Sequence, residues 1–197
     1  HKVPTPFLVM ATQNPIETEG TYPLPEAQVD RFMMKVLVGY PQEDEEFVIV
    51  QRVIGQAIEV AAVTSTEQIA QLQKTCRQGY VDPSLIQFAV KLVSATRHPE
   101  RFGMADWSRF ITFGASPRAT IGLIEGARAL AFLRGRSYAL PQDVIDLVPD
   151  VLRHRLVLSY EALSEGLTPE AIIAQILQAV PVPDKPLDSH VRTAPTA

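Results

Sequence analysis

The hydrophobic pattern divides the chain into two short apolar runs followed by a series of amphipathic segments. The two runs cover residues 7–12 and 33–38, and polar or turn-forming residues bound them. Runs of this length with such boundaries are typical of buried strands. Two strands are marginally stable alone, so we expect both to join a larger parallel sheet in the intact protein. Between them, a loop rich in glycine and proline predicts a turn, followed by a short helical stretch ending near Asp30-Arg31-Phe32.

Beyond residue 40 the pattern changes to helical spacing, with capping signals before each segment. The predicted helices cover residues 41–55, 65–79, 82–98, 116–135, 141–158 and 168–180. Ser65 and Gln68 fit a capping box, and a cap residue followed by proline occurs at residues 82, 116 and 168. Pro149 should break or kink the helix over 141–158. Residues 57–64 predict an extended connector, and residues 99–113 a loop or short helical turn.

These elements indicate a mainly α protein in which the end of an α/β domain precedes a helical domain. We place the first over residues 1–41 and the second over residues 42–180. Residues 181–197 are rich in proline and poor in apolar side chains, so they are expected to be disordered.

Composition argues against several classes of protein. The net charge of −4 argues against a general nucleic-acid binder, whose footprint is basic. No apolar run has the length of a transmembrane helix, so no membrane insertion is expected. The single cysteine, Cys76, excludes an internal disulfide and favours a reducing compartment, in line with a cytoplasmic protein. The four histidines show no metal-ligand spacing, so no metal site is predicted within the chain.

Two stretches carry a resemblance to a known family. They read ATQNPIETEGTYPLPEAQVDRF over residues 11–32 and GASPRATIGLIEGARALAFLRGRSYALPQDV over residues 114–144. The first resembles the signature of the MoxR-type AAA+ ATPases, and the second is similar to the opening of that family's helical lid. The similarity covers roughly residues 6–158. It implies that the chain joins the last strands of a P-loop α/β core to an AAA+ lid domain.

The phosphate-cradling sequence G-x-x-x-x-G-K-[ST] does not occur in the 197 residues. We therefore expect Walker A and Walker B to lie upstream, and the chain to be the C-terminal part of such an ATPase. By itself, this polypeptide should be inactive.

Asn14 follows the first apolar run, where open α/β sheets place ligands. Its amide could donate to a phosphate oxygen and orient a water. The simpler interpretation is an Asn-Pro turn. The resemblance implies sensor 1, which contacts the γ-phosphate and the attacking water.

Arg31 carries a guanidinium that can fork onto a phosphate. At the end of a short helix it could equally complement the helix dipole, or pair with Asp30 or Glu26. The resemblance implies an arginine finger that reaches the nucleotide of the neighbouring subunit.

Arg118 lies in the first turn of a predicted helix, where a cation faces the positive end of the dipole. A phosphate bound there would remove the conflict, and so would a neighbouring carboxylate. The resemblance implies sensor 2, a nucleotide-binding residue that links the lid to the nucleotide. The basic clusters at residues 97–101 and 153–155 are interpreted as solvated faces or contacts between lid and core.

The resemblance implies that the intact protein hydrolyses ATP with Mg²⁺ at subunit interfaces, as a homo-oligomer in a ring of six. It further implies chaperone-like remodelling or metal or cofactor insertion, with a von Willebrand factor A domain protein as partner. Two alternatives stay open: a non-enzymatic helical interaction module, and a helical DNA-binding domain that the acidic balance disfavours.

Overall fold

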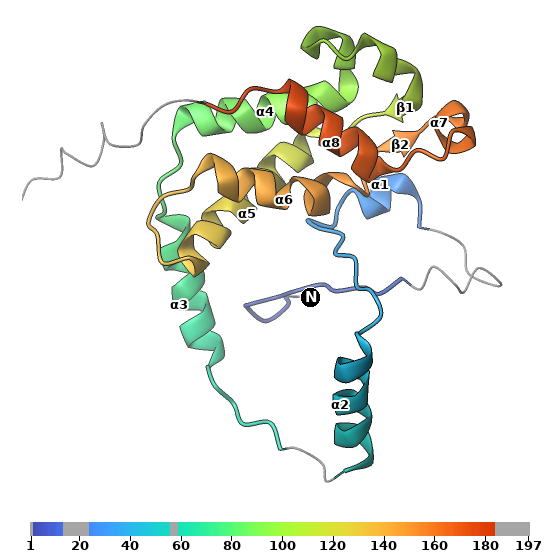
Figure 1. The fold of residues 1–197 in the computed structure, drawn as a ribbon. Coiled ribbons are helices and arrows are strands. Elements are labelled where there is room, and N and C mark those ends of the chain that lie inside the picture. Colours follow the sequence, from blue (N-terminus) through green and yellow to red (C-terminus); the bar gives the residue numbers. More distant parts are fainter. Residues whose placement is uncertain (1, 14–23, 56–58, 184–197) are drawn as a thin grey trace, which may run out of the picture.

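The computed structural model describes residues 2–13, 24–55 and 59–183, and helices dominate these segments (Figure 1). The elements in chain order are α1 (Glu26–Val29), α2 (Glu43–Ile54), α3 (Thr66–Arg77), α4 (Pro83–Arg97), η1 (Pro99–Phe102), η2 (Ala105–Phe110), β1 (Ile111–Phe113), α5 (Pro117–Leu133), α6 (Pro141–Leu152), β2 (Val157–Leu158), α7 (Tyr160–Ser164) and α8 (Pro169–Ala179). The mainly α class predicted from the sequence is confirmed.

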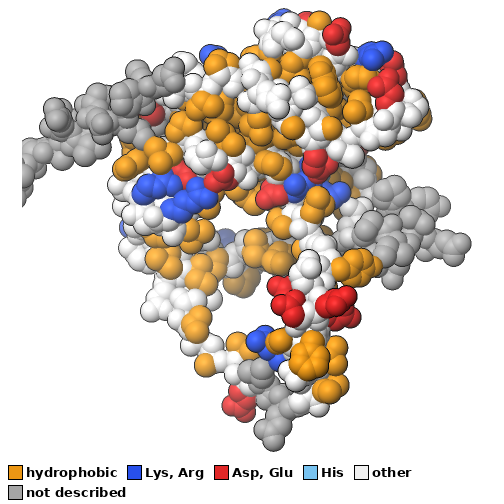
Figure 2. All heavy atoms as spheres, viewed as in Figure 1, with side chains coloured by type: hydrophobic (Ala, Val, Ile, Leu, Met, Phe, Trp, Pro, Cys, Tyr) orange, Lys and Arg blue, Asp and Glu red, His pale blue; other side chains and the backbone are white. Residues whose placement is uncertain are grey.

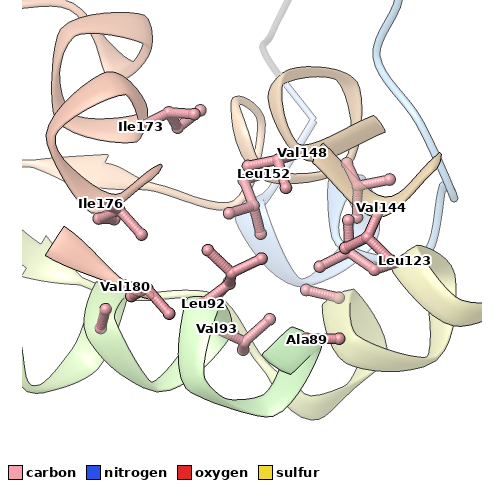
Figure 3. Packing of buried hydrophobic residues seen from close by; sticks show 14 of the residues in the cluster. Ala89, Leu92, Val93, Leu123, Val144, Val148, Leu152, Ile173, Ile176 and Val180 are labelled. Carbon is pink, nitrogen blue, oxygen red and sulfur yellow. The ribbon is translucent and has the colours of Figure 1, made fainter. Parts of the chain in front are cut away.

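The core lies between helices α4, α5, α6 and α8. Each helix turns an apolar stripe inward, as amphipathic spacing requires. Figure 3 shows side chains from these helices pointing toward one another. The fully buried members include Leu92, Leu123, Val144, Val148, Leu152, Ile172 and Ile176. This cluster fixes the ends of α5 and α6, on which the site described below is built.

Helix starts follow the capping signals in the sequence. The Ser65 hydroxyl accepts from Gln68 N at 3.2 Å, and the Gln68 side chain accepts from Ser65 N at 2.9 Å, which completes the predicted box. Asp82, Ser116 and Thr168 each cap a helix whose first residue is proline. A cap of this kind contributes on the order of 1 kcal/mol.

The predicted helix over 141–158 is wrong in its last six residues, 153–158. Pro149 lies inside α6 without ending it, and the helix stops at Leu152. Val148, Val151 and Leu152 are fully buried, so packing offsets the hydrogen bond that Pro149 cannot donate. Residues 157–158 instead form β2, which pairs antiparallel with β1.

The strands predicted at residues 7–12 and 33–38 are not formed. In the described residues the sheet consists of β1 and β2 alone. Leu8, Met10 and Val38 are 78%, 82% and 90% exposed, so the side chains expected inside a sheet face solvent. A strand needs a hydrogen-bonded neighbour, and the described residues supply none for either run.

Helix α2 stands away from the core (Figure 1) and has no buried residue. Figure 2 shows hydrophobic side chains over this helix next to its acidic first turn. Helix α3, in contrast, packs against α5. Within the connector predicted over residues 57–64, residues 59–64 adopt no regular helix or strand.

Candidate functional site

The site is built where residues 30–35 leave α1 and run along the adjoining ends of α5 and α6. Lys35 N donates to Asp150 O at 2.8 Å, which ties the segment to the end of α6. Met33 and Met34 lie against Gly122 and Gly126 of α5. A Cβ at Gly126 would come within 3.2 Å of Met33 Cε and 2.9 Å of Leu147 Cδ1, so glycine permits this close approach.

The carboxylate of Asp30 collects three side chains from distant parts of the chain. Ser116 Oγ donates to its two oxygens at 3.0 and 3.1 Å, and Arg118 Nη1 donates to Oδ2 at 3.1 Å. Arg155 Nε donates to Oδ1 at 2.9 Å. We call Asp30, Ser116, Arg118 and Arg155 the Asp30 cluster. It joins the end of α1 to the start of α5 and to the residue three positions beyond α6.

Arg155 is the buried member of the cluster, with 6% of its surface exposed. Besides Asp30, its guanidinium donates to three backbone carbonyls of the segment: Asp30 O at 3.0 Å, Phe32 O at 2.6 Å and Met33 O at 3.1 Å. It also donates to Val151 O of α6. Arg155 therefore holds the 30–33 backbone against the end of α6.

The two preceding residues hold the same segment. Arg153 Nη1 donates to Lys35 O at 2.6 Å, while its Nε donates to Glu170 of α8 at 2.9 Å. His154 Nε2 lies 3.1 Å from Phe32 O. Of the two interpretations offered for the basic run 153–155, a solvated face is wrong. The run is a contact surface for residues 30–35.

The electrostatics of the cluster favour a charged Asp30. Burial alone would raise the pKa of Asp30, but hydrogen bonds from Arg118, Ser116 and Arg155 outweigh it and hold the pKa below its ordinary value. With two arginines and one carboxylate, the cluster carries a net charge of about +1. Such a surplus can attract an anion at the exposed member, Arg118.

His154 gives the site a pH-dependent stability. Burial lowers the pKa of His154, and the charge of Arg155 lowers it further. Its Nδ1 is buried and has no hydrogen-bond partner in the described part of the chain, so protonation would bury an unpaired N–H. The folded protein therefore binds this proton more weakly than the unfolded chain, and its contribution to stability is lost as the pH falls below about 6.5.

We accordingly expect the urea midpoint of the chain to fall between pH 7.5 and pH 5.5. The variant His154→Gln should flatten that dependence, because Gln keeps a donor for Phe32 O and does not titrate. The matched control is His98→Gln, the same exchange at a histidine that is about half exposed. Equal slopes for wild type and His154→Gln would contradict the assignment.

The sequence-predicted residues have different outcomes. Arg118 lies in the first turn of α5 with 58% of its side chain exposed, and the anion beside it is the Asp30 carboxylate. Its Nε and Nη2 have no partner among the described residues. Arg31 is exposed, and neither of the pairs considered as alternatives, with Asp30 or with Glu26, is formed. Asn14 lies outside the described residues.

The sequence reasoning missed Asp30, Ser116 and Arg155 as a unit. Asp30 adjoins Arg31 in the first quoted stretch, and Ser116 had been interpreted only as a helix cap. The residue types were visible in the sequence, because a carboxylate and two arginines lie near the ends of predicted helices. Ser116 and Arg155 lie 86 and 125 positions from Asp30 in the sequence, so their contact with it forms only in the folded chain and cannot be read from local spacing.

Over residues 2–13, 24–55 and 59–183, no group of three or more His, Cys, Asp or Glu side chains is placed to hold a metal ion. None of the helices in these ranges has both the length and the apolar character needed to cross a membrane.

Comparison with known proteins identifies the class. The family model for the AAA lid domain matches residues 106–176, and that for the "ATPase family associated with various cellular activities (AAA)" matches residues 1–34. The chain thus combines an AAA+ core segment with an AAA+ lid.

Comparison with individual proteins shows which AAA+ proteins this chain is similar to. The chain is 51% identical over 92% of its length to Chaperone MoxR1 of Mycobacterium tuberculosis, covering 48% of that protein. It is 42% identical over 90% of its length to YeaC of Bacillus subtilis, covering 53% of it. A crystal structure from Cytophaga hutchinsonii, described as a candidate ATPase, matches 93% of the chain with a TM-score of 0.89 and 40% identity, over 56% of that chain.

The chain belongs to the MoxR-type AAA+ ATPases. It spans about half the length of the curated relatives it matches.

Proposed function

We propose that the intact protein hydrolyses ATP with Mg²⁺ at the interfaces of a ring of subunits, and that this chain supplies three of the groups that act on the nucleotide. Asn14 would orient the attacking water in the same subunit. Arg31 would reach the nucleotide of the neighbouring subunit, and Arg118 would contact the phosphates from the lid. Residues 1–41 would complete the core and residues 42–180 would form the lid. Of the tail predicted over 181–197, residues 184–197 lie outside the described residues.

The observation that carries the proposal is the ion pair between Arg118 and Asp30. Arg118 lies in the stretch that matches the lid, and Asp30 lies in the stretch that matches the ATPase core. The pair therefore brings the proposed lid arginine beside the residue that precedes the proposed finger. Both arginines are exposed, as groups that bind an external nucleotide must be.

The residues fit a nucleotide in part. Arg118 has guanidinium nitrogens free of described partners, in a cluster with a net positive charge, so it can bind a phosphate oxygen. Among the described residues no group of three or more His, Cys, Asp or Glu side chains is placed to hold a metal ion, and we assign the Mg²⁺ ligands to the remainder of the ATPase core. When bound, ATP and Mg²⁺ supply the phosphoryl group and the charge neutralisation. The residues of this chain orient the nucleotide and stabilise developing charge.

Chaperone-like remodelling is the downstream activity that we propose, because one close relative is named a chaperone. Metal or cofactor insertion into a partner is the narrower form of the same activity. A hexameric ring, a von Willebrand factor A domain partner and a cytoplasmic location complete the proposal.

The test measures ATP binding and hydrolysis by the intact protein and by its Arg118→Ala variant. Loss of the lid arginine should raise the Kd for ATP and lower kcat, each by about tenfold, as expected for one charge-assisted contact. The matched control is Arg109→Ala, because Arg109 is 57% exposed and also ion-paired, to Glu161 at 2.9 Å. Wild-type kinetics for Arg118→Ala would contradict the proposal.

The 197-residue chain assayed alone should show no ATP turnover above a blank. It contains no glycine-rich phosphate loop, so neither the phosphates nor Mg²⁺ would be held. Phosphate release by the purified chain, persisting through a second purification step, would overturn this expectation.

A further inference from the structure

The Asp30 carboxylate lies between the two arginines to which nucleotide roles are proposed. We propose that Asp30 is a positioning residue that aims Arg118 at the nucleotide and couples it mechanically to Arg31. This inference rests on the proposed function and adds a residue and a connection to it.

The first step is the geometry of the carboxylate. Oδ1 accepts from buried Arg155 at 2.9 Å, Oδ2 accepts from Arg118 at 3.1 Å, and Ser116 Oγ contacts both oxygens. Arg155 and Ser116 therefore fix the orientation of Asp30 independently of Arg118. Asp30 in turn holds Arg118 through Nη1, and Nε and Nη2 of Arg118 have no partner among the described residues, so they are available for a phosphate oxygen.

The second step is charge. An isolated pair of Asp30 with Arg118 would be neutral and would attract a phosphate weakly. Arg155 supplies a second positive charge on the far side of Asp30, so the surplus of one charge remains at the exposed arginine. Asp30 can thus orient Arg118 without cancelling its attraction for an anion.

The third step is the connection to Arg31. The carbonyls on both sides of this residue, Asp30 O and Phe32 O, accept from the same Arg155 Nη2, at 3.0 and 2.6 Å. The backbone that carries Arg31 is therefore held by the guanidinium that also fixes the Asp30 carboxylate. A shift of Arg118 toward a phosphate pulls on Asp30, and Asp30 is covalently adjacent to Arg31.

The test is a double-mutant cycle in the intact protein with Asp30→Asn, Arg118→Ala and the combination. Binding is measured with a fluorescent ATP analogue, and hydrolysis is measured as kcat for ATP. We expect Asp30→Asn to weaken binding by about fivefold and to lower kcat by about tenfold, within the range of coupling between linked sites. The double variant should be less impaired than the two single effects combined, because Asp30 acts on the nucleotide in part through Arg118.

Controls separate positioning from loss of structure. Glu26→Gln removes a carboxylate from α1, the short helix that Asp30 follows, and should leave both constants at wild-type values. Asp30→Glu retains the charge and should recover part of the binding lost in Asp30→Asn. If Asp30→Asn does not fold, the same cycle is measured with Asp30→Glu, for which a smaller coupling of the same sign is expected.

The outcomes are distinct. Additive effects of Asp30→Asn and Arg118→Ala would overturn the inference, as would tighter binding by Asp30→Asn, since the carboxylate would then compete with nucleotide. If Arg118→Ala and Arg31→Ala are impaired but Asp30→Asn equals wild type, the proposed function stands and this inference alone fails. Wild-type kinetics for Arg118→Ala would remove both.

Discussion

Replacing Arg31 by alanine in the intact protein should lower kcat for ATP by about a thousandfold while leaving the Kd for ATP within about twofold of wild type. The magnitude is that of an arginine supplied in trans to a phosphoryl transfer. Such a group stabilises charge that develops only in the transition state, so its loss affects kcat more than binding. The exposed position of Arg31, with no ion pair to the described residues, is consistent with a group reserved for another subunit.

Mixing experiments give this prediction its sharpest form. Subunits carrying Arg31→Ala are mixed with subunits carrying Asn14→Ala, which keep the arginine but lack the residue proposed to orient the attacking water in cis. Mixed rings should hydrolyse ATP faster than the weighted mean of the two separate variants, because an Arg31→Ala site beside an Asn14→Ala neighbour has both groups. The control is Arg52→Ala, a second exposed arginine near the end of a helix, which should keep wild-type kcat. A loss of less than about fivefold in Arg31→Ala would contradict a finger role.

Replacing Arg155 by alanine should lower the free energy of unfolding of the 197-residue chain by about 3 kcal/mol. Removing one partner of a buried ion pair leaves the other charge, here the Asp30 carboxylate, without that partner. Four carbonyls, at Asp30, Phe32, Met33 and Val151, would lose a charged donor. Burial lowers the pKa of Arg155, while the hydrogen bond to Asp30 raises it, as expected for a desolvated cation held by its partner. Urea unfolding followed by far-UV circular dichroism measures the change.

The matched control is again Arg109→Ala, because its pairs with Glu161 and Glu165 are exposed. Pairs of this kind are worth less than about 1 kcal/mol. Equal destabilisation of the two variants would show that Arg155 does not hold residues 30–35 as described. The conservative variant Arg155→Lys should also be destabilised, since one ammonium cannot reach the acceptors served by a planar guanidinium.

Much of the helical architecture could be predicted because the relevant signals are local. Ser65 with Gln68, and Ser116 with Pro117, mark helix starts through hydrogen bonds within a few residues. The prediction differed from the structure where packing decides. Pro149 was expected to break or kink the helix over 141–158; the buried residues around it keep α6 helical to Leu152, and residues 157–158 pair with β1 instead of extending the helix. The apolar runs at 7–12 and 33–38 have the composition of strands, yet a strand also requires neighbours.

The candidate site was predictable in part for the same reason. Arg118 was identified from its conflict with the helix dipole, and a neighbouring carboxylate was one of the two expected remedies. Nothing local identifies Asp30 as that carboxylate, or Arg155 as its anchor, because these residues meet only through tertiary packing. A pair of Arg31 with Asp30 was one of the alternatives to a finger role, and Asp30 is instead paired with Arg118 and Arg155.

The central claim is that Arg118, held by Asp30, contacts the nucleotide. The most direct measurement is a structure of the intact protein with a non-hydrolysable ATP analogue and Mg²⁺. The account predicts an Arg118 guanidinium nitrogen within about 3 Å of a phosphate oxygen, with the Asp30 contact retained. A bound nucleotide whose phosphates lie beyond the reach of Arg118 would contradict it.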